Sequence, residues 1–145
     1  MEAERIHFAE RLPWPQYLAR YRLADLALDT FVYSAGSTAV SALWAGVPLL
    51  THAGPTNAAR MGASICAAAG LPEMICDSHA AYEERAVALA AHPEQRHALR
   101  RKLAAQRATA PLFDTTGFAR SLETAYRMMW QAYHDCAAPR SLRVT

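Results

Sequence analysis

A short polar segment at residues 29–38 holds the side chains best placed for chemistry. It follows the apolar residues 26–28, contains Gly36, and leads through Ser37 and Thr38 into a run of helix-forming residues. Free backbone N–H groups and the dipole at a helix start stabilise an anion by about 0.3–1 kcal/mol. A glycine there lets the backbone approach a phosphate closely. Two interpretations stay open: the segment binds a diphosphate, or Ser37 or Thr38 only caps the helix.

The segment differs from the common phosphate-binding motifs, and the rest of the chain shows no pattern typical of a metal site. No Gly-Lys-Ser/Thr follows it, and its glycines lack the Gly-x-Gly-x-x-Gly spacing. The six histidines form no His-x-x-x-His pair and no Asp-x-Asp occurs, so neither a metal nor a cofactor is expected. The three cysteines form no Cys-x-x-Cys pair, which favours reduced thiols and a cytoplasmic location.

Length and composition are those of one folded domain. The chain has 145 residues, of which 52% are hydrophobic and 19% charged. Fifteen Lys and Arg against 13 Asp and Glu give a net charge of +2, so no nucleic-acid partner is expected, despite a basic helix at residues 94–107. Residues 30–59 carry no charge, but glycines and prolines interrupt them. They predict the buried centre of a soluble domain rather than a membrane span.

Short apolar segments alternate with helical ones along the chain. The apolar segments predict strands over residues 5–8, 26–29, 47–51 and 74–76. Start and stop signals predict helices over residues 16–21, 37–44, 58–69, 78–91, 94–107 and 116–134. This order predicts an α/β fold, a Rossmann-like three-layer lobe whose parallel sheet is flanked by helices. Ligands of such sheets bind at the carboxyl ends of the strands.

The last helix carries apolar residues at helical spacing, and the chain ends in a polar tail. The stripe runs from Phe118 through Leu122, Ala125 and Met129 to Tyr133. Its spacing predicts that this face is part of the core. Residues 1–137 are expected to form one lobe, and residues 138–145 a disordered tail.

An ordered series of sequence blocks resembles the protein O-GlcNAc transferase and SPINDLY-like glycosyltransferases. The blocks include Arg22–Asp25, Leu28–Thr30, Leu43–Pro48 and Pro111–Asp114, and the similarity extends over residues 5–133. The resemblance implies the C-terminal, UDP-binding lobe of a glycosyltransferase of the GT-B architecture. The complete enzyme would transfer a sugar, expected to be N-acetylglucosamine, from a UDP-sugar to protein Ser or Thr with inversion, without a metal.

The resemblance also implies seven contacts with UDP. They are Leu12, Tyr17 and Arg20 at the uracil, Gly36, Ser37 and Thr38 at the diphosphate, and Ser41 at the ribose. The family carries histidine where Gly36 stands and aspartate where Ser41 stands. A second hypothesis is therefore a degenerate, non-catalytic lobe that serves as a binding or scaffold module. An epimerase-like enzyme is a weaker alternative, because the chain shows no cluster of carboxylates and histidines.

The expected partners follow from the resemblance and the composition. They are a UDP-sugar and an acceptor protein, the latter held by a catalytic lobe and tetratricopeptide repeats that this sequence does not contain. No catalytic residue is assigned, and the chain alone is expected to be inactive. No membrane partner is expected, whereas an uncovered face of the lobe would favour self-association.

Overall fold

The structure, a computed structural model, describes residues 2–136 and 138–144. These residues form a small parallel sheet with helices packed around it. The strands are β1 (Ala27–Leu28), β2 (Leu49–His52) and β3 (Ile75–Cys76). The α-helices are α1 (Trp14–Arg20), α2 (Ser37–Trp44), α3 (Asn57–Ala68), α4 (His79–Ala91), α5 (Pro93–Gln106) and α6 (Thr115–His134). Short 3-10 turns lie at Ala3–Arg5, Tyr21–Leu23, Pro72–Met74 and Pro111–Phe113.

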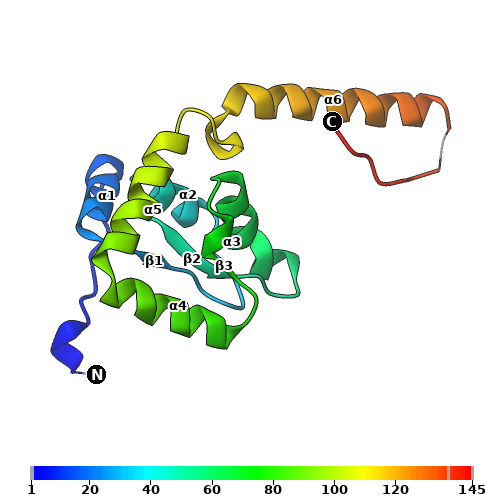
Figure 1. Cartoon of the computed structure of the whole chain (residues 1–145). Coiled ribbons are helices and arrows are strands. Elements are labelled where there is room, and N and C mark those ends of the chain that lie inside the picture. The colour runs from blue at the N-terminus through cyan, green and yellow to red at the C-terminus, as the bar shows by residue number, and fades with distance from the viewer. Residues whose placement is uncertain (1, 137, 145) are drawn as a thin grey trace.

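The sheet has the strand order β1-β2-β3, and both pairs are parallel. Each connection passes through a helix, as parallel neighbours require. The helices α2 and α3 pack on each other and on β2, whereas α4 contacts β2 from the other face and also contacts α5. Figure 1 shows the resulting layers, with the sheet between α3 and α4. The α/β fold with a parallel sheet flanked by helices is therefore confirmed.

Local signals place most helix ends. Side-chain oxygens of Thr56, Ser78 and Asp114 accept hydrogen bonds from backbone N–H groups in the first turns of α3, α4 and α6. Gly46 and Gly70 follow α2 and α3 with φ of 86° and 75°, a conformation that glycine adopts without steric cost. The predicted boundaries of these helices agree with the structure to within about two residues.

The core lies between the sheet and its helices. It is built around the fully buried side chains of Leu43, Leu50, Leu71, Met74 and Leu89. Most of residues 39–51 are buried, as expected for the uncharged stretch, but its first part, residues 30–33, forms an exposed loop. That loop leaves the carboxyl end of β1 and leads towards α2.

The strand expected at residues 5–8 is wrong. Ala3–Arg5 forms a 3-10 turn, and residues 6–13 have no regular secondary structure. The side chains of this segment are exposed, Phe8 by 95%. A strand needs a neighbour to satisfy its backbone hydrogen bonds. Within the described part of the chain, no strand pairs with this segment, so its apolar alternation alone does not produce one.

The burial expected for the last helix is also wrong. The helix itself is present, but α6 has no buried residue, and Phe118 and Tyr133 are 68% and 76% exposed. In Figure 1, α6 extends away from the rest of the lobe. An amphipathic pattern predicts a helix that needs a partner for its apolar face, and the described residues leave most of this face exposed.

Residues 138–144 form no regular secondary structure. The expected boundary at residue 137 and the last residue of the tail lie outside the described residues. No helix in the described part of the chain is long and apolar enough to span a membrane.

Candidate functional site

A buried carboxylate organises the loop that follows β1. Asp29 is 6% exposed, and its Oδ1 accepts hydrogen bonds from the backbone N–H groups of Thr30 (2.8 Å) and Ala35 (2.7 Å). Its Oδ2 accepts from the hydroxyls of Ser34 (2.6 Å) and Thr51 (2.6 Å). These four bonds satisfy the buried charge and fold the loop back onto β2.

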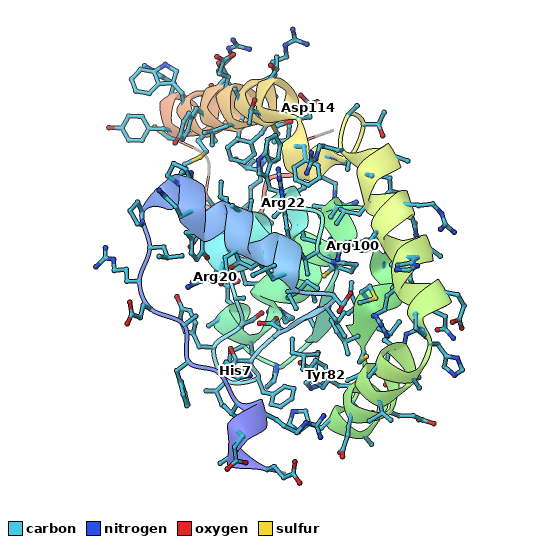
Figure 2. The ribbon with its side chains drawn as sticks, turned by 90° about the vertical axis from the view of Figure 1, so that its left-hand side faces the viewer. His7, Arg20, Arg22, Tyr82, Arg100 and Asp114 are labelled. Carbon is cyan, nitrogen blue, oxygen red and sulfur yellow. The ribbon has the colours of Figure 1, made fainter. Side chains whose placement is uncertain are left out.

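Two helices hold Asp29 and its partner Ser34 in place. The backbone N–H of Gly62 in α3 donates to Ser34 Oγ at 2.7 Å, and a side chain at Gly62 would run into Asp29 Oδ2. From α4, the Tyr82 hydroxyl donates to the backbone oxygen of Asp29 at 3.0 Å (Figure 2). Burial raises the pKa of Tyr82, so this hydroxyl keeps its proton. The loop that leads into α2 is thus fixed from three sides.

This loop delivers the start of α2 without a side-chain cap. The N-cap residue is Gly36, not Ser37 or Thr38, so the expected capping role is wrong for both. The helix already begins at Ser37, so Ser37 and Thr38 are the first two residues of its first turn rather than the residue before it. Both residues are exposed to solvent. The N–H groups of that turn point out of the helix start. A cavity of about 470 Å³ lies beside it, lined by Tyr33 and by the loop through Thr38.

A larger cavity lies on the α1 side. It measures about 830 Å³ and is lined by Leu12, Tyr17 and Arg20 together with Trp14 and residues 9–11. The rings of Trp14 and Tyr17 are stacked with centroids 5.5 Å apart. Arg20 lies at the end of α1 (Figure 2) and donates from Nη1 to a backbone oxygen at residue 10, at 2.7 Å. The three residues expected at the uracil therefore share one cavity.

The two cavities are linked through α1 and α2. The hydroxyls of Tyr17 and Tyr21 are 2.7 Å apart, and Tyr21 donates on to the backbone oxygen of Thr38 at 3.4 Å. Burial, followed by the hydrogen bond with Tyr17, raises the pKa of Tyr21 to about 12, so it remains neutral. A third cavity of about 460 Å³ shares Trp14 with the α1 cavity and Ser37 with the α2 cavity.

The third cavity also contains Ser41, which completes the set of seven. Ser41 is buried, and its hydroxyl donates to the backbone oxygen of Ser37 at 2.9 Å. All seven residues expected at UDP therefore line three neighbouring cavities, which share Trp14 and Ser37 as lining residues. Their contacts with UDP stay predictions.

Three residues near these cavities were assigned no individual role from the sequence. Trp14 lies three residues before Tyr17, a spacing that brings side chains together on a helix. Tyr21 lies four residues after Tyr17, with the same consequence. The signal for Asp29 was its place between an apolar strand and a stretch without charge that contains several hydroxyls. No group of three or more metal-ligating side chains is found among the described residues.

Comparison with known sequences decides the family. The model of Glycosyl transferase family 41 matches residues 1–122. The chain belongs to glycosyl transferase family 41. It is 36% identical over 145 residues to the probable UDP-N-acetylglucosamine–peptide N-acetylglucosaminyltransferase SEC of Arabidopsis thaliana, covering 99% of this chain and 15% of that protein. To the corresponding SPINDLY protein of Oryza sativa subsp. japonica it is 37% identical over 128 residues, covering 88% and 14%.

The fold of this family 41 chain has a counterpart among solved structures. A mutant of the O-GlcNAc transferase of Thermobaculum terrenum superimposes with a TM-score of 0.87 at 34% identity, covering 93% of this chain and 26% of that one. The chain therefore has the Rossmann-like fold of a GT-B lobe. It spans about 15% of the length of the curated relatives named above.

Proposed function

We propose that this family 41 chain is the UDP-binding part of an inverting glycosyltransferase that transfers N-acetylglucosamine from UDP-sugar to protein Ser or Thr. One observation carries the proposal. Residues 12–20 and 36–41 lie apart in the sequence, yet they line three cavities that share Trp14 and Ser37. A base, a ribose and a diphosphate would follow this order from α1 to α2.

Each part of the surface suits one part of the nucleotide. The uracil would stack against the pair formed by Trp14 and Tyr17, and Arg20 lies close to the Tyr17 ring, its guanidinium carbon 5.9 Å from the centroid. The first turn of α2 would present its free backbone N–H groups and the hydroxyls of Ser37 and Thr38 to the diphosphate. Such donors stabilise the negative charge that grows on departing UDP. The role assigned to this surface needs no metal or further cofactor.

The relatives' names and the exposed α6 suggest the remaining partners. The acceptor protein would be held by parts of the complete enzyme that this sequence does not contain, so the chain alone is proposed to be inactive. A continuous assay of UDP release that found acceptor-dependent turnover would contradict this.

The uncovered stripe on α6 would favour self-association. Cys66 and Cys76 are free thiols, which suits a reducing, cytoplasmic location.

A scaffold module without a nucleotide site is the second candidate. It is favoured by Ser41, whose hydroxyl already donates within α2, and by Gly36, which offers no side chain to a phosphate. A gain-of-function variant separates the two candidates. In Gly36→His the new Cβ would come within 2.9 Å of Met61 Sδ, the sulfur of a flexible side chain that can move. A restored UDP site would bind more tightly, whereas a scaffold would not respond.

Calorimetric titration with UDP tests the proposed function directly. Stacking of a base on an aromatic ring contributes about 1–3 kcal/mol, so Tyr17→Ala should weaken UDP binding by about five-fold or more. Tyr126→Ala, which removes an exposed tyrosine from α6, is the matched control and should leave the affinity unchanged. Equal affinity of the Tyr17→Ala variant and the unchanged protein would contradict the proposed uracil site.

A further inference from the structure

A second group of aromatic side chains lies on the far side of the loop that follows β1. Phe31 comes from that loop, His52 from the end of β2, and His79 from the first turn of α4. The ring centroids of Phe31 and His79 are 4.4 Å apart, and those of His52 and His79 are 4.7 Å apart. Tyr82 packs edge-on against Phe31 at 5.0 Å. None of these rings lines the cavities proposed for UDP.

These rings form one wall of a separate cavity, which we call the aromatic slot. It measures about 260 Å³ and is lined by Phe31, His52 and His79 together with Val32, Pro55 and Thr56. Sites for whole drug-sized ligands measure about 300–1,000 Å³, so the slot has room for a single ring-sized group. No Asp, Glu, Lys or Arg lines it. The lining therefore favours an uncharged, apolar ring.

His52 adds one directed polar contact to the slot. Its Nδ1 lies 3.2 Å from the backbone oxygen of Cys76. A carbonyl oxygen can only accept, so this contact requires a proton on Nδ1, and in that tautomer Nε2 is an acceptor. A bound ring that carries an O–H or N–H group can donate to this nitrogen while its faces pack against Phe31 and His79.

We propose that the aromatic slot binds an aromatic side chain, tyrosine or tryptophan, of a polypeptide. Aromatic rings combine a large apolar surface with one polar end, which matches an uncharged, mainly apolar lining with a few polar side chains, among them His52 and Thr56. A hexose fits less well, because several of its hydroxyls would be buried without carboxylate or amide partners. The slot opens at the carboxyl edge of the sheet, where ligands of parallel α/β sheets bind. The proposal does not depend on UDP binding.

The test is an NMR titration of the full chain, without UDP, with N-acetyl-tyrosine amide. A parallel titration uses methyl glucoside, a monosaccharide. The tyrosine probe should give saturable shifts at Val32, Thr56 and the His52 and His79 ring protons, and the sugar should give none there. Shifts confined to other surfaces, no saturable shifts up to the solubility limit, or tighter binding of the sugar would each overturn the proposal.

Variants locate the contact within the slot. An aromatic pair contributes about 0.5–1.5 kcal/mol, so Phe31→Ala should weaken binding of the tyrosine probe by about two- to ten-fold. His79→Ala should weaken binding of the tyrosine probe to a similar extent. His79 is exposed, so this variant replaces Phe31→Ala in the test if Phe31→Ala folds poorly. Phe118→Ala removes an exposed ring from α6 and is the control. Unchanged affinity in the folded slot variants, or an equal loss in the control, would overturn the proposal.

Discussion

Replacing Asp29 with asparagine keeps the shape of the side chain and changes what its outer atom can do. Asp29 Oδ1 accepts from two backbone N–H groups, which cannot reverse their direction, so the amide oxygen must take that position. The amide NH₂ then faces the hydroxyls of Ser34 and Thr51, which now donate to Oδ2. All four bonds change from charge-assisted ones of about 1.5–3 kcal/mol each to neutral ones of about 0.5–1.5 kcal/mol, and the two at Oδ2 must also reverse their direction. The neutral amide is less costly to bury than the carboxylate, which offsets part of this, so the net loss of stability should be at least about 2 kcal/mol.

Urea unfolding followed by circular dichroism measures this loss as a shift of the midpoint at unchanged slope. Asp25→Asn is the matched control, because Asp25 is exposed and its replacement should change stability by no more than about 0.5 kcal/mol. Equal stability of the Asp29→Asn variant and the unchanged protein would refute the argument that this carboxylate holds the loop. A loss of similar size in the control would show that net charge, not the buried network, is responsible.

Three further perturbations test other parts of the structure. Gly62→Ala should lower the free energy of unfolding by about 1–3 kcal/mol, because the new Cβ would collide with Asp29 Oδ2. Alanine favours helices more than glycine does, so higher stability in urea would show that this collision does not occur. Burial raises the pKa of Cys66 to about 12 from about 9. The buried thiol therefore contributes its full stability below about pH 9, and this contribution is lost as the pH rises towards 12. Urea midpoints of the unchanged protein should fall over this pH range, and those of Cys66→Ala should fall less. Phe118→Ser should cost no more than about 0.5 kcal/mol by thermal unfolding, whereas Leu103→Ala, in the core, should cost about 2–5 kcal/mol. Comparable losses in both would mean that α6 is packed.

Local signals were sufficient for most elements of the fold. The side chains of Thr56 and Ser78 cap α3 and α4, whose starts lie within one residue of the predicted ones at 58 and 78. Gly46 and Gly70 end helices where the sequence placed those ends. Such features depend on a few neighbouring residues, so the sequence carries them directly.

Features that depend on a distant partner could not be predicted in the same way. The apolar residues at 5–8 have the alternation of a strand, but pairing depends on a neighbour that the described chain does not supply. The stripe on α6 has the right spacing, but burial depends on a surface to cover it.

The candidate site shows the same division. Its seven residues came from resemblance to a family, whereas the roles of Trp14, Tyr21 and Asp29 became visible only in three dimensions. Asp29 accepts hydrogen bonds from residues as far away in sequence as Tyr82, and Tyr21 donates to Thr38. No local pattern encodes such contacts. They nevertheless determine where the loop and the start of α2 lie relative to α1.

The most direct test of the central claim is to locate UDP on the chain by NMR. The account predicts intermolecular nuclear Overhauser effects between the uracil protons and the Tyr17 ring. It also predicts saturable amide shifts at Gly36, Ser37 and Thr38 in the same titration. Saturable shifts only elsewhere on the lobe would contradict a nucleotide site formed by α1 and α2. Unchanged spectra at about 1 mM UDP, a concentration that detects even weak binding, would contradict it as well.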